Sequence, residues 1–377
     1  MIDSITFQLS EGQFEMKKYN KLDGLRTQRG KGFLVSSQYC EQYAKEKKKE
    51  GIYFPVITFA KRKAIRDDFK EVLEIQFSLP KLIYGTNLFE VDINDLNKIY
   101  ENLLSKLDEI GIKTSSEKLE KAILKKVDFS KVIKLPDYLG TADFVINKLL
   151  MFNYKFRSQF KIKEYSNGKG VCLSFYNTSQ RYTIYDKFGE IYNLGYTNIE
   201  KKLTNDLKEG IKRKNALKFE LSIQRKDSLE ALLRRRINDK EKDFLLKDIL
   251  KNELARDVLL DIFNEVFGQP ALGLVCLSEM EENRLLAYLD KTKLTLAKQH
   301  KLYYWSRMTT KFGIAGTWEQ LRLKCKGGSF ATNKKEIALI IQELGKIDGY
   351  VPNLIEFLRA EHNTFNIIKP QISLEGL

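Results

Sequence analysis

Histidine and cysteine are scarce in this sequence, and both shortages limit the possible chemistry. Only two histidines are present, His300 and His362, so the first three-quarters of the chain cannot supply a two-histidine metal site. The four cysteines show no Cys-Xaa-Xaa-Cys spacing, so neither a zinc knuckle nor a disulfide framework is indicated and reduced thiols are expected. A metal bound in that part of the chain must use oxygen ligands, which favours Mg²⁺ or Mn²⁺ over zinc.

Two further absences concern location and energy supply. No apolar run reaches about 18 residues, and Met1-Ile2-Asp3-Ser4 has no basic segment leading into an apolar one. We therefore expect a cytoplasmic protein that neither crosses nor binds a membrane. No Gly-Xaa-Xaa-Xaa-Xaa-Gly-Lys phosphate loop is present, which argues against a built-in helicase motor.

Positive charge is what the chain has in excess. Its 377 residues contain 65 Lys and Arg against 50 Asp and Glu, a formal net charge of +15. This balance suits a polyanionic partner, because Lys and Arg contacts to phosphates displace condensed counterions. A solvated basic surface in a lysine-rich chain is the alternative. The apolar fraction of 43% is enough to fill the core of one large domain or of two.

The periodicity of apolar residues changes once along the chain. Up to about residue 240, alternating segments predict strands over 4–9, 52–60, 72–82, 126–135, 155–165, 170–176, 181–187 and 217–224. Helical patterns separate several of them and dominate after residue 241. We therefore expect an α+β fold, with a largely antiparallel sheet and packed helices forming one domain over residues 1–240. A mainly α-helical C-terminal domain over 241–377 would bind DNA or a partner.

Sorting the strand faces gives a candidate site. Three strands carry one carboxylate each at mid-strand on the polar face: Glu74, Asp128 and Glu220. A fourth segment places Tyr185 and Lys187 on one face. If these strands are neighbours, the carboxylates converge into a cation site beside the tyrosine. The alternative is that acids are ordinary on the wet face of an antiparallel sheet.

Several segments, in this order, resemble the gene II/gene X replication proteins of filamentous phages and their plasmid relatives, which are rolling-circle initiators. The resemblance covers nearly the whole chain. It rests on the opening Met1-Ile2-Asp3, on EIQFSLPKLIYGTNLF at 74–89, on the strand around Asp128, on YTIYDKFGEI at 182–191 and on LKFELSIQRK at 217–226.

The resemblance implies a site-specific nicking and joining endonuclease. In such proteins a tyrosine attacks a phosphodiester at the origin, which leaves a 5′-phosphotyrosine and a 3′-hydroxyl that primes synthesis. Tyr185 matches the tyrosine of the family motif, Lys187 and Glu190 match its lysine and glutamate, and Glu220 matches the acid of the late strand. Host helicase and polymerase would be partners, beside origin DNA as a single strand and as supercoiled duplex.

The chemistry of the residues fits these roles. A phenol has a pKa near 10, so its attack at neutral pH needs a nearby cation or base. Lys187 would lower the pKa of Tyr185 or balance the phosphate charge. A divalent ion, Mg²⁺ or Mn²⁺, on Glu74, Asp128 and Glu220 would polarise the phosphate. Glu190 would be a ligand or a base.

Basic residues near the predicted strands and in one aromatic helical stretch are candidates for DNA contacts. The alternative is that they are solvated charges at helix ends or, for the aromatic stretch, part of the core. The candidates are Lys161, Lys163, Arg225, Lys226, Arg234, Arg235, Arg236, Lys301 and Arg307.

Two other functions fit the same residues. One is a relaxase-like or transposase-like strand transferase of another mobile element, and the other is a non-catalytic protein that binds an origin.

Overall fold

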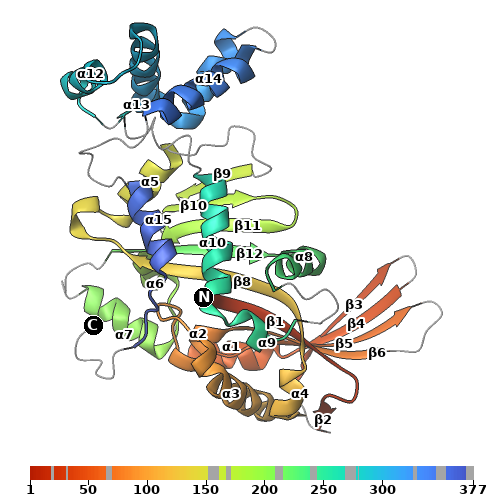
Figure 1. The fold of residues 1–377 in the computed structure, drawn as a ribbon. Coiled ribbons are helices and arrows are strands. Elements are labelled where there is room, and N and C mark those ends of the chain that lie inside the picture. Colours follow the sequence, from red (N-terminus) through yellow and green to blue (C-terminus); the bar gives the residue numbers. More distant parts are fainter. Residues whose placement is uncertain are drawn as a thin grey trace.

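A ten-stranded antiparallel sheet forms the centre of the computed structural model (Figure 1). Its strand order is β3-β4-β5-β6-β1-β8-β12-β11-β10-β9. The structure describes residues 1–17, 21–30, 33–64, 70–151, 161–166, 171–208, 215–237, 244–267, 277–278, 280–325, 329–344 and 354–370. The expected α+β class with a helical C-terminal region is confirmed.

The strands of the large sheet and a separate β2–β7 pair account for the β-structure of the described residues. Their bounds are β1 Ile2–Ser10, β2 Glu15–Met16, β3 Gly24–Gly30, β4 Phe33–Tyr39, β5 Val56–Ala64, β6 Lys70–Ser78, β7 Ile112–Lys113, β8 Ile123–Lys134, β9 Lys161–Ser166, β10 Val171–Tyr176, β11 Gln180–Asp186 and β12 Ala216–Ile223.

Helices fill the connections and most of the C-terminal third. Their bounds are α1 Glu41–Lys49, α2 Leu79–Tyr84, α3 Leu96–Glu109, α4 Ser116–Glu120, α5 Ala142–Met151, α6 Lys187–Leu194, α7 Asn198–Lys208, α8 Lys226–Ile237, α9 Leu246–Ile249, α10 Asn252–Val266, α12 Glu282–Asp290, α13 Leu296–Lys324, α14 Ser329–Leu344 and α15 Leu354–Thr364. No helix in the described ranges is long and apolar enough to cross a membrane.

Alternation gives the sheet one apolar and one polar face. Side chains two apart on a strand share a face, so Phe219 and Leu221 of β12 lie on the face opposite Lys218 and Glu220. Helices α5, α8, α10 and α15 pack on the strands of the apolar face, and their buried residues join the same core cluster (Figure 1). On the polar face, Ile191 of α6 packs against Val132 of β8 and Ala216 of β12, and the polar side chains beside this cluster form the site.

The apolar face continues its packing past residue 240. On α10, the Phe263 ring centroid lies 6.2 Å from that of Phe219, and on α15 the His362 ring centroid lies 4.6 Å from it. The boundary expected at residue 240 falls outside the described residues, since 238–243 are not described. Because α10 and α15 complete the core of the sheet, a cut there would not separate two independent cores.

A segment near the C-terminus also joins the sheet. The Glu90 carboxylate accepts hydrogen bonds from Lys131 Nζ at 2.9 Å, from the Val132 amide at 3.0 Å and from the Ile368 amide at 3.0 Å. The Glu90 amide in turn donates to the Ile368 carbonyl at 2.8 Å. This buried ion pair therefore ties residue 368 to the strand β8.

Strand β1 contains an irregularity that matters for the site. Ile2 pairs with Phe129 of β8, but Ser4 pairs with Asp128, so Asp3 is an extra residue without a partner on β8. Such a bulge bends a strand and redirects a side chain. It brings the Asp3 carboxylate to Lys218 on the polar face.

Candidate active site

Tyr185 lies on the polar face near the end of β11. Across the sheet it is directly opposite Lys218 of β12 on one side and Cys172 of β10 on the other. Its hydroxyl donates a hydrogen bond to Glu220 Oε2 at 3.3 Å. Tyr182, which faces the other way, is fully buried in the apolar core. The tyrosine and the acid that were predicted on polar strand faces are thus in contact.

A buried ion pair lies beside this contact. Lys218 Nζ is 2.6 Å from Asp3 Oδ1 and 4.0 Å from Glu220 Oε2. Asp3 and Lys218 were not among the predicted site residues. Alternation places Lys218 on the polar face and could have identified it, but no sequence pattern reveals the bulge that directs Asp3.

Burial and charge set the protonation of this group. Burial, followed by the charge of Asp3, raises the pKa of Glu220 to about 7, against the opposing charge of Lys218. Burial alone would also raise the pKa of Asp3, but the charge of Lys218 and its hydrogen bond hold that pKa below its usual value. The pKa values of Glu220 and Asp3 are both shifted, and Lys218 acts on both groups. Such clusters of groups with shifted pKa values are typical of functional sites.

The hydroxyl of Tyr185 is held in its protonated form. Burial, and then the charges of Glu190 and Glu220, raise the pKa of Tyr185 well above its ordinary value. The expected lowering of this pKa by Lys187 is not found. The phenol therefore needs a proton acceptor in direct contact, and Glu220 is in that position.

Lys187 differs from its prediction because strand β11 ends at Asp186. The Asp186 side chain accepts a hydrogen bond from the Phe188 amide and caps α6. Lys187 is therefore the first residue of the helix and does not share a strand face with Tyr185. Its ammonium is fully buried and donates to Asn87 Oδ1 and Glu190 Oε2. Burial lowers the pKa of Lys187, although Glu190 opposes this shift.

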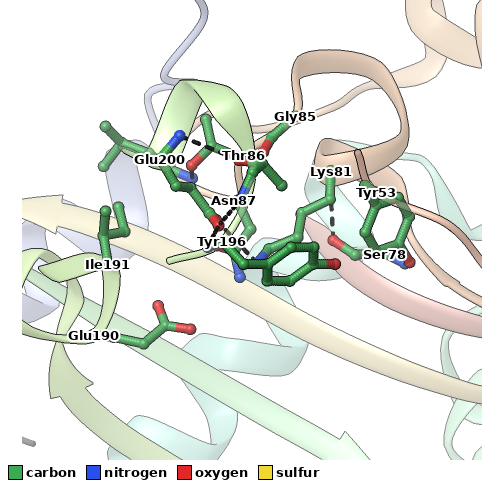
Figure 2. A network of polar contacts seen from close by, with 12 residues as sticks. Tyr53, Ser78, Lys81, Gly85, Thr86, Asn87, Glu190, Ile191, Tyr196 and Glu200 are labelled. Carbon is green, nitrogen blue, oxygen red and sulfur yellow. Dashed lines mark hydrogen bonds and ion pairs between the residues drawn. The ribbon is translucent and has the colours of Figure 1, made fainter. Parts of the chain in front are cut away.

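A second polar network, formed by Lys81, Tyr196 and Glu200, lies nearby (Figure 2). The side chains of Asn87 and Glu190 both contact Lys187, and nearby Lys81 Nζ is 2.9 Å from Glu200 and 5.0 Å from the centre of the Tyr196 ring. Lys81 and Lys187 are both close enough to Asp3 to lower its pKa. Lys81, Lys187 and Lys218 thus together balance the negative charge of the acids at the site.

Asp128 borders the site from β8. Its carboxylate accepts a hydrogen bond from the Ser4 hydroxyl and lies 3.4 Å from Lys126 Nζ. Its second oxygen, Oδ1, is buried and has no hydrogen-bond partner in the described part of the chain. Asp128 opposes Ser222, one pair along from Glu220 on the same face, so the two carboxylates are diagonal neighbours on adjacent strands.

Glu74 is not brought to the same place. It pairs with Gln8 of β1, whereas Asp128 pairs with Ser4 of the same strand. Four residues along β1 correspond to about 13 Å at about 3.3 Å per residue, and β1 also separates the two strands. Glu74, Asp128 and Glu220 therefore do not surround one point. The described residues contain no group of three or more His, Cys, Asp or Glu side chains able to hold a metal ion.

The predicted basic residues on α8 lie beyond the end of β12 that is remote from Tyr185. Arg225, which directly precedes α8, and Arg235 are exposed there, and the ammonium of Lys226 and the guanidinium of Arg234 lie 3.1 Å and 3.8 Å from the Glu230 carboxylate. Arg236 pairs with Asp261 of α10.

The other predicted DNA contacts lie further along the chain or outside the described side chains. Lys301 pairs with Glu336 at 2.5 Å, and Arg307 donates to the carbonyls of Leu277 and Met280. Lys161 and Lys163 are on β9, but their side chains lie outside the described part.

Comparison with known proteins identifies the family of the chain. The family model for the N-terminal part of the gene II type of replication-associated protein matches residues 1–234, which include every strand of the sheet and the whole cluster around Tyr185. No curated protein and no solved structure matches the chain.

Proposed function

Because the chain belongs to this family of phage replication-associated proteins, we propose that it starts rolling-circle replication by nicking one DNA strand at an origin. Tyr185 is the proposed nucleophile. The observation that carries the proposal is the hydrogen bond from the Tyr185 hydroxyl to Glu220. Tyr185 is also directly opposite Lys218 on the neighbouring strand.

The reaction follows from these contacts. Glu220 takes the proton of the Tyr185 hydroxyl as the phenolic oxygen attacks the phosphorus. The bond from phosphorus to the 3′ oxygen breaks, that oxygen takes up a proton, and a 5′-phosphotyrosine and a free 3′-hydroxyl result. The reverse reaction rejoins the ends without ATP, because the phosphotyrosine retains the energy of the broken bond. Lys218 supplies positive charge beside the tyrosine.

Two carboxylates fit the proposed divalent ion. Asp128 Oδ1 is a buried oxygen without a hydrogen-bond partner in the described ranges, and the nearby Asp128 contributes to the raised pKa of Glu220. Mg²⁺ often binds through one or two carboxylates and completes its shell with water and substrate phosphate oxygens. Such an ion, Mg²⁺ or Mn²⁺, would polarise a non-bridging phosphate oxygen. We propose Asp128 and Oε1 of Glu220 as its protein ligands, which leaves Oε2 of Glu220 to take the proton of Tyr185.

Covalent capture tests the nucleophile. Wild-type protein, incubated with a labelled single-stranded oligonucleotide of the cognate origin and Mg²⁺ or Mn²⁺, should form an adduct that mass spectrometry maps to Tyr185. Tyr185→Phe removes one oxygen and should abolish the adduct. Tyr182→Phe is the matched control, because Tyr182 is three residues away on the buried face and should leave the adduct intact.

Two results would contradict the proposal. An adduct that persists in Tyr185→Phe would assign the chemistry to another residue. A wild-type protein that binds its origin but forms no adduct under any of these conditions would be a non-catalytic origin-binding protein. For strand separation after the nick, we propose that a host helicase and polymerase act on the freed 3′ end, since the sequence has no phosphate loop of its own.

A further inference from the structure

Beyond Tyr185 the polar face of the sheet continues as a row of paired residues. Arg181 of β11 is directly opposite Tyr176 of β10 on one side and Ser222 of β12 on the other. Lys161 of β9 pairs with Tyr176, which extends the row to the sheet edge. Arg181 is exposed and Tyr176 is half-buried, so this row is accessible to solvent.

The charge of Arg181 has no acidic partner within the described ranges. No carboxylate there forms an ion pair with Arg181, whereas the lysines of the site all have acidic partners. An arginine beside a tyrosine on an open sheet face offers a phosphate contact and an aromatic ring together. Sheets that bind unpaired nucleic acid use these two kinds of side chain.

We propose that this row holds the unpaired DNA strand on its way to Tyr185, with Arg181 on a phosphate and Tyr176 stacked on a base. This inference rests on the proposed nicking function. Arg181 and Tyr185 share a strand face four residues apart, about 13 Å at about 3.3 Å per residue.

The same geometry favours a single strand over a duplex. In a duplex the flat faces of the bases are already stacked on their neighbours, so the ring of Tyr176 has no base face to contact. In an unpaired strand each base can turn onto the ring. The held strand would then run along β11 and present a phosphodiester to the hydroxyl of Tyr185.

Binding measurements in a Tyr185→Phe background test the row without cleavage. The probe is fluorescein-labelled oligo(dT), followed by anisotropy over a range of salt concentrations. Adding Arg181→Gln should weaken binding and reduce the slope of log affinity against log salt by about 0.7, the value for one lost phosphate contact on a single strand. Arg256→Gln removes the same charge from α10, over the opposite face, and should change neither quantity.

Substitutions of Tyr176 test the stacking contact separately. Tyr176→Leu should weaken binding by about fivefold or more, whereas Tyr176→Phe keeps the aromatic ring and should bind as the parent does. Circular dichroism melting of each variant confirms that it is folded.

The outcomes separate this inference from the proposed function. Parent-like affinity in both Arg181→Gln and Tyr176→Leu would overturn the inference that this row binds the unpaired strand, even if Tyr185 forms the adduct. A loss of affinity for duplex DNA but not for oligo(dT) would also overturn it. If both variants lose oligo(dT) binding and the wild type still forms no adduct, the row stands and the nicking proposal fails.

Discussion

The Asp3–Lys218 pair allows a quantitative test of how the site is held together. Lys218 Nζ and Asp3 Oδ1 are 2.6 Å apart, with side-chain exposures of 1% and 11%. Lys218→Met keeps the length of the side chain but leaves the Asp3 carboxylate buried without its partner. Removing one partner of a buried pair costs about 3–5 kcal/mol of unfolding free energy, because the remaining charge is no longer compensated.

A double-mutant cycle isolates the interaction itself. Asp3→Asn with Lys218→Met removes both charges, so the double variant should be considerably more stable than the sum of the two single losses. We expect a coupling of about 2–3 kcal/mol, at the upper end for residues in contact. Urea denaturation followed by circular dichroism gives the four free energies.

An exposed pair with the same separation provides the control. Lys17 Nζ and Asp108 Oδ1 are also 2.6 Å apart, but their side chains are 40% and 66% exposed. Water and salt screen this pair, so its cycle should give a much smaller coupling. Additive losses at Asp3 and Lys218, or equal coupling in the two pairs, would refute the argument that burial makes the pair at the site strong.

Three further predictions concern the core. Burial lowers the pKa of His362 to about 4, so its neutral form stabilises the fold fully above pH 6.5, and this contribution of about 3 kcal/mol is lost as the pH falls from 6.5 to 4. Other groups titrate in the same range, so the measured quantity is the difference in unfolding free energy between wild type and His362→Leu, which should shift by about 3 kcal/mol against the wild type between these pH values in urea denaturation. The buried Tyr182 hydroxyl has no hydrogen-bond partner within the described part, so Tyr182→Phe should raise the unfolding free energy by about 1 kcal/mol, and a loss of that size would show a missed partner. Truncation near residue 245 removes α10 and α15 from the face of Phe219, so we expect an aggregated or unfolded product by size exclusion and circular dichroism, and a monomeric, folded product would contradict this.

Much of the sheet could be predicted because its central strands alternate cleanly. In β6 and β12 the apolar residues recur at every second position, and in β8 Val127 and Phe129 do so around Asp128, so these strands were expected close to where they lie. Strands β3 and β4 were missed, since Gly24–Gly30 is polar, begins and ends with glycine and shows no alternation. Helix α6 was missed because its first residues continue the strand pattern until the Asp186 side chain caps the helix.

The site was predicted in part for a related reason. Alternation indicates on which face a residue lies but not its register against a neighbouring strand, so Tyr185 and Glu220 could be placed on the polar face while the separation of Glu74 could not be foreseen. Asp3 depends on a bulge that changes alternation at one residue. Asn87 lies in the segment 74–89 that carries the family resemblance, but its contact with Lys187 depends on tertiary structure.

The link between Glu90 and Ile368 has a consequence for synthesis of the chain. The two residues are 278 positions apart, and at a translation rate of about 5–20 residues per second the second follows the first by roughly 14–56 s. Throughout that interval the Glu90 carboxylate and the Lys131 ammonium lack their contacts with residues 366–368. The part of the apolar face that α15 covers, beside Phe219, also stays exposed during that interval. Ribosome-bound chains arrested before residue 354 should therefore be sensitive to protease and bind chaperones, and they should gain resistance only when the last helix has emerged.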